Sequence, residues 1–430
     1  MRKFIIIWFG QLISTIGSGL TGFALAIWMF EKTGQSAPFL YVALFNSIPV
    51  VIFSLFAGAL VDRLNRRWVM ILADTGAALS TFVIFLLYIS GNLEVWHIYV
   101  SSFFASLFST FQIPAFTASI TMLVPKDQLT RANGMVQSGQ SVEGLISPLL
   151  AGLLLGAIGV EGLIIIDFLT FFVAVSTLFF VVIPQPKVTE EQKVQKIIKD
   201  IREGWSFLST RPGLLGIAVY MTIINILLTS VIALIRPLIL SIADAKTLAL
   251  SETISSAGLL LGGVLISWWG GTKHKMRDIY VGVLVGGFGL MFAGLRPIFW
   301  WIAIGIFFFM FEIPTVNAQI RSIVQTKSPS AIQGRVFSVI FMIARLGPPI
   351  GFGLAALLTD QFFEPGMMPG GMLAQIFGPL FGTGPGRGIG LMMSLAGVGF
   401  WIVTLIMYLY PRLRLVEDEL PDIEPETSAS

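Results

Sequence analysis

The sequence predicts an all-α membrane protein, with twelve transmembrane helices arranged as two pseudo-symmetric six-helix bundles. Three observations predict this fold class: an apolar composition, twelve apolar stretches of membrane-spanning length, and an internal repeat that relates the two halves. Of 430 residues, 55% are hydrophobic and 12% are charged, and the mean hydropathy is +0.85. A soluble domain carries roughly 25% charged residues, so this chain has too few polar side chains to cover a surface in water.

The composition also excludes several functional classes. The chain has no cysteine, so it cannot form disulfides, iron–sulfur clusters or thiolate zinc sites. Its two histidines, His97 and His274, lie at the ends of apolar stretches, which disfavours a multi-histidine metal site. The sequence shows neither a Walker motif nor a nucleophile–base set. We therefore expect no enzyme activity, no cofactor and no nucleic-acid partner.

Apolar stretches of about 20 residues are long enough to cross the hydrocarbon core of a bilayer. The first one is too long for a signal-peptide core, and no small-residue cleavage pattern follows it, so we expect it to be retained as a span. The twelve predicted spans are residues 4–30, 38–61, 68–92, 95–124, 132–158, 161–184, 212–240, 246–270, 278–296, 297–322, 331–360 and 387–411.

The basic residues predict the orientation of these spans. Most of the 27 lysines and arginines lie in alternate connections, beginning with Arg2 and Lys3 and ending with Arg412 and Arg414. The positive-inside rule places such connections in the cytoplasm. We therefore expect a multi-pass protein of the cell (inner) membrane with both termini in the cytoplasm.

The longest polar connection divides the spans six and six. In it, Ile197, Ile201, Trp205 and Leu208 recur at helical spacing among charged residues, which predicts an amphipathic helix on the membrane surface. A solvated charged linker is the alternative. The predicted domains are an N-terminal six-helix bundle over residues 1–184, a cytoplasmic linker over 185–211, a C-terminal six-helix bundle over 212–411 and a cytoplasmic tail over 412–430.

The two predicted bundles repeat each other in sequence. Residues 111–114 read FQIP, and 200 residues later residues 311–314 read FEIP; the same offset relates Pro148 to Pro348. Two six-span halves of the same orientation imply a pseudo-two-fold axis along the membrane normal. Repeats of this kind place the substrate site near the midplane of the membrane, between the halves.

The connection after the second span, residues 58–67, reads GALVDRLNRR. It resembles the loop signature of the major facilitator superfamily, G-x-L-a-D-r-x-G-r-r, with an asparagine at the second glycine. The resemblance implies the major facilitator fold, and a gate latch formed by Asp62, Arg66 and Arg67. Gly58 would let two helices approach closely. The alternative is that the two arginines only enforce topology.

The fifth span is similar to a second pattern of the superfamily. Residues 139–152 read GQSVEGLISPLLAG, which is similar to the antiporter signature of drug exporters, G-x-x-x-G-P-x-x-G-G. Gly139 and Gly152 permit close helix contact, and Pro148 removes one backbone donor and bends the helix. The similarity implies export more than import; the alternative is a generic kinked helix.

Three ionisable side chains fall near the middle of predicted spans, counted at about 1.5 Å per residue. They are Glu143, Glu312 and Arg345. A charge at that depth costs at least about 2.5 kcal/mol and usually faces a cavity or a partner. We predict that Glu143 and Glu312 are proton-coupling carboxylates and that Arg345 is their counter-charge. Acidic groups in these two spans also resemble those of macrolide- and multidrug-exporting relatives.

Other interpretations of the intramembrane charges stay open. Glu312 and Arg345 would form a static ion pair if they only stabilise the bundle. Glu31, Asp74, Asp167 and Arg236 lie nearer span ends, where we expect the side chains to snorkel toward water.

In the superfamily, spans one, four, seven and ten line the central cavity. In this sequence those spans supply mostly aromatic and amide side chains, which suit an amphiphilic organic substrate better than a sugar or a phosphate. For each aromatic residue the alternative is ordinary packing. The predicted cavity-lining residues are Gln11, Trp28, Phe111, Gln112, Asn225 and Asn317, together with Glu312.

We therefore predict a secondary active transporter that exports hydrophobic or amphiphilic compounds, such as drugs or natural products, by alternating access. Its expected partners are a small-molecule substrate, protons and the lipid bilayer, and we expect a monomer. The alternative is a facilitator or importer of a small metabolite; a more remote one is a non-transporting membrane scaffold or receptor, or a lipid-handling protein. The outer connection 361–388 either caps the outer mouth or is idle.

Overall fold

A computed structural model describes residues 1–61, 64–125, 128–181, 183, 193–329 and 332–419. Within these ranges the secondary structure consists of helices, and no β-strand occurs. Eleven helical stretches among the described residues are long and apolar enough to cross a membrane. One of them is 47 residues long and holds two of the predicted spans. Each of the twelve predicted spans therefore overlaps one of these helical stretches, and the predicted fold class is confirmed.

The first compact unit comprises Met1–Glu191 and Ala243–Thr253. Its longest helix, α5, is broken at Gly159, where φ is 68°. Only glycine adopts this backbone conformation readily, and the break lies between the predicted fifth and sixth spans. The helices of this unit are α1 (Arg2–Thr33), α2 (Ala37–Val61), α3 (Arg66–Ile89), α4 (Val95–Leu123) and α5 (Leu129–Phe180).

The second compact unit comprises Gln192–Ile242 and Ile254–Ser430, so that α9 is divided between the two units. A π-helical turn, Thr359–Phe363, follows α13. The helices are α6 (Lys193–Ser209), α7 (Pro212–Ile232), α8 (Ile235–Leu240), α9 (Ala245–Trp269), α10 (Lys275–Leu295), α11 (Phe299–Thr326), α12 (Gln333–Ala344), α13 (Gly347–Leu358), α14 (Glu364–Met367), α15 (Met372–Phe381), α16 (Arg387–Leu409), α17 (Pro411–Arg414) and α18 (Val416–Glu419).

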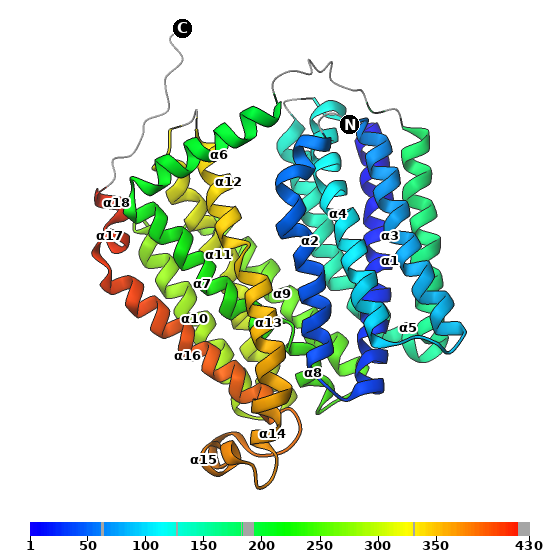
Figure 1. Cartoon of the computed structure of the whole chain (residues 1–430), viewed down its shortest axis with the longest axis vertical. Helices are drawn as coiled ribbons and strands as arrows, with labels where there is room; N and C mark the ends of the chain where they lie inside the picture. The colour runs from blue at the N-terminus through cyan, green and yellow to red at the C-terminus, as the bar shows by residue number, and fades with distance from the viewer. Residues whose placement is uncertain (62–63, 126–127, 182, 184–192, 330–331, 420–430) are drawn as a thin grey trace. The chain divides into compact units, whose positions relative to one another are not determined.

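The polar connection between the bundles contains the expected helix, α6, which crosses the ends of α7 and α12 (Figure 1). Its Leu208 is fully buried, whereas Trp205 is exposed. Glu203 of α6 forms an ion pair with Arg335 of α12. At Gly204 a Cβ atom would lie 2.7 Å from the carbonyl oxygen of Arg335, so the two backbones pack closely. These contacts attach α6 to the second unit.

Paired glycines bring α10 against its two neighbours. A Cβ atom on Gly287 of α10 would lie 2.9 Å from the carbonyl oxygen of Gly397 of α16. On the other side, a Cβ atom on Gly289 would lie 2.5 Å from the carbonyl oxygen of Gly305 of α11. Lipid tails are as apolar as leucine, so helices in a membrane associate chiefly through such close packing.

Hydrogen bonds reinforce the contact between α10 and α16. Ser394 Oγ of α16 donates to the carbonyl oxygen of Met291 at 3.0 Å, and Trp401 Nε1 donates to that of Leu284 at 2.9 Å. These bonds satisfy polar atoms that would find no hydrogen-bond partner in lipid. The packing of α10, α11 and α16 therefore combines backbone contact with polar bonds.

The substitution Gly294→Ala tests the backbone contact. Gly294 of α10 faces the carbonyl oxygen of Gly390 of α16, and a Cβ atom there has no room. We expect overpacking to cost about 1–3 kcal/mol, measured as a lower melting temperature in detergent micelles. Gly353→Ala is the matched control, because a Cβ atom at Gly353 meets nothing within 4 Å. Equal melting temperatures for the two variants would contradict the close packing.

Candidate functional site

A chain of polar side chains joins three helices of the first unit. Gln112 Nε2 of α4 donates to Gln11 Oε1 of α1 at 2.8 Å. Gln11 Nε2 in turn donates to Asp74 Oδ2 of α3 at 2.8 Å. Gln11 is buried. The Asp74 carboxylate is therefore held by α1 inside the bundle, and the expectation that it snorkels outward is wrong.

A second carboxylate, Asp167 in the later half of α5, also lies against α1. Its side chain is 6% exposed, and Ser18 Oγ of α1 donates to Asp167 Oδ1 at 3.0 Å. A Cβ atom on Gly17 would lie 3.0 Å from Asp167 Cα, so the glycine makes room for this approach. The expectation that Asp167 snorkels toward water is therefore wrong as well.

Glu143, in the earlier half of α5, approaches α1 at Gly19. A Cβ atom on that glycine would lie 3.3 Å from Glu143 Oε1. One turn further along α5, Ser147 Oγ donates to the carbonyl oxygen of Ile16 at 3.2 Å. Glu143 is half-buried, and no residue that the structure describes donates a hydrogen bond to its carboxylate. The carboxylate is thus positioned by packing against α1 alone.

Glu312 lies in the middle of α11 and is 5% exposed. It packs against two glycines of α10: a Cβ atom on Gly286 would lie 2.8 Å from Glu312 Oε1, and one on Gly282 would lie 3.4 Å from Oε2. Within the described part of the chain, Oε2 accepts no hydrogen bond and Glu312 forms no ion pair. A buried carboxylate without partners is costly while it is charged.

Arg345 does not compensate that charge. It lies where the helix breaks between α12 and α13, and its side chain is exposed. No ion pair joins it to Glu312 in the structure, so neither the predicted counter-charge contact nor the alternative static pair is formed. The next turn packs against α7, where a Cβ atom on Gly347 would lie 3.0 Å from Asn225 Cβ.

The predicted cavity residues of α1 and α4 do not all lie together. Trp28 is about 26 Å along α1 from Gln11, at 1.5 Å per residue. It packs edge-on against Tyr88, with ring centroids 6.5 Å apart, and its ring centroid lies 5.0 Å from Lys32 Nζ. These residues line a cavity of about 560 Å³ near the connection between α3 and α4. Trp28 therefore lies at the other end of α1 and does not share a site with Gln11 and Gln112.

The remaining cavity candidates have varied surroundings. Phe111 of α4 packs against a buried apolar cluster that includes Ile7 and Ala115. Asn225 of α7 is half-buried, and its Nδ2 donates to the carbonyl oxygen of Met221 one turn earlier, at 2.8 Å. Asn317 of α11 is exposed. Phe111 thus packs in part against the core of the first unit, whereas the Asn317 side chain is uncovered.

The loop arginines clamp the start of α3 to its neighbours. Arg66 is buried, and its Nη1 donates to the carbonyl oxygen of Ala118 of α4 at 2.9 Å. Arg67 Nη2 donates to the carbonyl oxygen of Phe179 of α5 at 2.7 Å. The Asn65 side chain accepts from the Arg67 amide at 3.1 Å and caps α3. Both arginines therefore hold helices together within the first unit.

Of the other predicted latch and antiporter residues, those that the structure describes lie on α2 and α5. Asp62 falls outside the described residues, and Gly58 lies in the last turn of α2. Gly139 packs beside α1, and Pro148 and Gly152 are buried further along the same part of α5. The small residues thus lie along one helix, as the antiporter pattern implies.

The second unit has a corresponding anchor that sequence reasoning missed. Asp278 of α10 accepts hydrogen bonds from Gln319 Nε2 of α11 at 2.8 Å, and from Thr272 Oγ1 at 2.7 Å. By the 200-residue offset, Gln319 matches Ser119, which adjoins the carbonyl that Arg66 binds. Each half thus ties its third span to its fourth near the same position of the fourth span, although Arg66 and Asp278 themselves are not related by this offset.

Helical stretches long and apolar enough to cross a membrane, with carboxylates buried between them, indicate a membrane transporter rather than a soluble enzyme. The family model described as the Major Facilitator Superfamily matches residues 7–352. The chain therefore belongs to the major facilitator superfamily.

Several relatives are exporters by name. The chain is 28% identical over 368 residues to macrolide efflux protein A of Streptococcus pyogenes, covering 84% of this chain and 90% of the relative. It is 22% identical over 365 residues to the multidrug efflux pump Tap of Mycolicibacterium fortuitum, covering 83% and 89%.

Solved structures share the fold. An inward-facing, unoccupied bacterial homologue of the human lysosomal transporter Spinster superposes with a TM-score of 0.73 at 15% identity, covering 99% of this chain and 98% of that one. The nucleoside transporter NupG gives a TM-score of 0.70 at 12% identity, covering 95% and 99%. At these identities the likeness concerns the fold alone.

The substitution Gln11→Leu tests the polar chain in the first unit. It removes the donor to Asp74, and we expect it to destabilise the protein by about 1–3 kcal/mol, seen as a lower melting temperature in detergent. In an Asp74→Leu background the same change should cost much less, because no carboxylate is left unsatisfied. Gln137→Leu, at an exposed position of α5, is the control. Equal costs in both backgrounds would contradict the coupling.

Proposed function

We propose that this protein is a proton-coupled exporter of hydrophobic or amphiphilic compounds, working by alternating access in the cell membrane. The observation that carries the proposal is Glu312, a mid-span carboxylate that is buried against glycines and has no hydrogen bond on Oε2 and no ion pair among the described residues. A proton is the one ligand small enough to neutralise this group where it stands.

The energetic argument concerns the packing of α10 on α11. A charged Glu312 in this contact costs several kcal/mol of desolvation with no compensating pair, whereas the protonated acid is neutral. Binding a proton therefore stabilises the close arrangement of Glu312 with Gly282 and Gly286, and releasing it favours an arrangement that admits water. A change of protonation can thus bias the conformation of this half.

The first unit supports the proposal through α1. Three carboxylates approach this helix: Asp74 through Gln11, Asp167 through Ser18, and Glu143 at Gly19. Gln11 and Ser18 are two turns apart, about 10 Å along the helix. We propose that Glu143, the one without a hydrogen-bond donor among the described residues, is the second coupling carboxylate. Asp74 and Asp167 would position α1.

The relatives and the predicted cavity residues support the proposed substrate class. Macrolide efflux protein A and the pump Tap are exporters by name. The amides of Gln112, Asn225 and Asn317 offer hydrogen bonds without charge, which suits a large amphiphile with few ionised groups. A facilitator or importer of a small metabolite is the alternative. A transport rate that does not depend on the proton gradient would favour it.

The loop after α2 would act as the gate latch of this cycle. Arg66 and Arg67 already fasten α3 to α4 and α5, so the loop end is held rigidly. We propose that Asp62, which precedes these arginines in the sequence, latches the cytoplasmic side during the cycle. The basic residues at this end of the spans support the assignment of both termini to the cytoplasm.

Proteoliposomes with an imposed pH gradient test the coupling. We expect Glu312→Gln to abolish gradient-driven accumulation of a radiolabelled macrolide, because glutamine is neutral at any pH, while binding of the macrolide is retained. Glu143→Gln should reduce the accumulation in the same way. Glu161→Gln, at an exposed position near the break in α5, is the matched control. Wild-type accumulation in both Glu312→Gln and Glu143→Gln would remove the coupling role.

The substrate class is tested separately. Inverted membrane vesicles containing the protein should take up a radiolabelled macrolide on energisation, and a protonophore should abolish the uptake. A nucleoside serves as the polar comparison and should not accumulate. Macrolide uptake that persists undiminished with the protonophore present would support the facilitator instead.

A further inference from the structure

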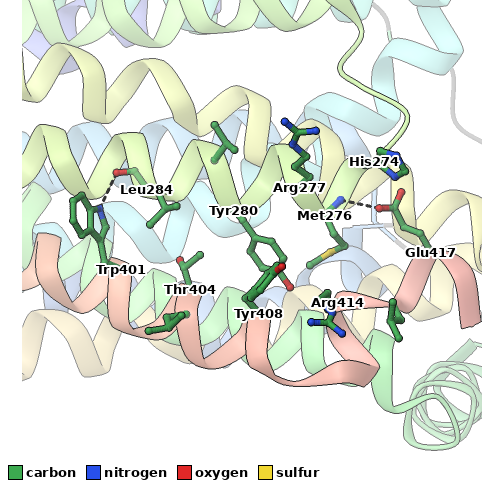
Figure 2. A pocket seen from close by; sticks show the side chains of 13 residues that line it. His274, Met276, Arg277, Tyr280, Leu284, Trp401, Thr404, Tyr408, Arg414 and Glu417 are labelled. Carbon is green, nitrogen blue, oxygen red and sulfur yellow. Dashed lines mark hydrogen bonds between the residues drawn. The ribbon is translucent and has the colours of Figure 1, made fainter.

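A groove of about 600 Å³ lies on the second unit between α10 and α16, and the short helices α17 and α18 close one end of it (Figure 2). Along the two long helices its lining is aromatic and aliphatic, whereas basic side chains gather at the end near α17. The groove is separate from the contact of Glu312 with α10, and the proposed transport cycle makes no use of it.

The apolar wall of the groove is turned outward. Val281 of α10 is 52% exposed and Leu405 of α16 is 58% exposed, although both lie in predicted spans. Apolar side chains exposed in this way face lipid in a membrane protein, because exposing them to water is unfavourable. Trp401 lines the end of the groove opposite α17, and its hydrogen bond to the Leu284 carbonyl fixes the indole ring (Figure 2).

The basic end of the groove offers two arginines. Arg277 lies in the first turn of α10 and Arg414 at the end of α17, and both are exposed. Neither forms an ion pair within the part of the chain that the structure describes. The guanidinium carbon of Arg414 lies 5.4 Å from the centroid of the Tyr408 ring, which orients it along the groove.

The acidic residue of the lining is already engaged. Glu417 of α18 accepts hydrogen bonds from the backbone amides of Lys275 and Met276 at 3.0 and 2.9 Å, which caps the start of α10. Lys327 Nζ donates to the Glu417 carbonyl at 2.5 Å. These bonds hold α18 in place, so the basic end of the groove is preformed and the Glu417 carboxylate is turned to α10.

A buried hydroxyl lines the same groove. Tyr280 is 7% exposed, and its hydroxyl oxygen has no hydrogen-bond partner among the described residues. Its ring lies between those of Tyr220 and Tyr408, with centroids 6.4 and 5.7 Å away. A buried hydroxyl left unbonded costs free energy, and Tyr280 lies between the basic and apolar parts of the groove lining.

We propose that this groove binds an anionic phospholipid from the surrounding leaflet. The phosphate would lie between Arg277 and Arg414, and one acyl chain would run along Val281 and Leu405. Arginine suits this role because its planar guanidinium bonds phosphate oxygens in pairs. The position at the end of two spans matches the depth of a headgroup, and the sequence of basic, polar and apolar walls matches the sequence of groups along a phospholipid.

Native mass spectrometry of the full-length protein in detergent tests the proposal, with phosphatidylglycerol as the probe. We expect Arg277→Gln/Arg414→Gln to weaken phosphatidylglycerol binding by about tenfold or more, since charge-assisted hydrogen bonds are lost. Arg2→Gln/Arg131→Gln removes the same charge from exposed span ends of the first unit and should leave binding unchanged. Phosphatidylcholine should bind more weakly than phosphatidylglycerol to the wild type.

Two further arms keep the proposal falsifiable. Val281→Trp fills the apolar part of the groove without altering charge, and it should also weaken phosphatidylglycerol binding. This variant tests the proposal even if the double arginine variant is unstable. Glycerol 3-phosphate should not displace the lipid at matched concentration. Unchanged lipid binding in both groove variants would overturn the proposal, as would equal competition by glycerol 3-phosphate, which would indicate a site for soluble anions.

Discussion

The structure depends on one constraint: within hydrocarbon, a polar group has no water to bond with and must find its partner in the chain. Helices meet this need for the backbone, and Gly159 interrupts α5 only where a new span begins. Side chains meet it across helices, as Gln11 does for Asp74 and Thr404 does for Tyr220. Glu312 departs from this pattern with an acidic group, for which the lack of a partner is costlier than for a neutral side chain.

The two halves repeat in sequence but differ in chemistry. Position 112 carries an amide that joins a hydrogen-bonded chain, whereas the matching position 312 carries an acid in an apolar contact with α10. In the first half the acids lie on α3 and α5 and converge on α1. The duplicated scaffold thus has its titratable groups in different places on each side. Such asymmetry allows protonation to bias one half without acting equally on the other.

The membrane spans and the depth of Glu312 within its span could be predicted from the sequence, for physical reasons. Apolar length located the spans, and counting residues from a span end placed Glu312 at mid-depth. Position along a span alone does not reveal which face a side chain occupies, so the prediction that Asp167 snorkels toward water misses its hydrogen bond with Ser18. The pairing of Arg345 with Glu312 failed because the helix breaks at Arg345, and a break changes the direction of the side chain. Contacts of that kind arise from tertiary packing.

The glycine contacts of α10 have a consequence for how the second half can deform. Where backbone meets backbone, no flexible side chain is present to yield, so α10, α11 and α16 form a rigid body. By contrast, α7 gives way to α8 after Ala233, and α12 gives way to α13 at Arg345. We therefore expect bending of this half to be concentrated in those two interrupted helices, with α10, α11 and α16 as the fixed frame.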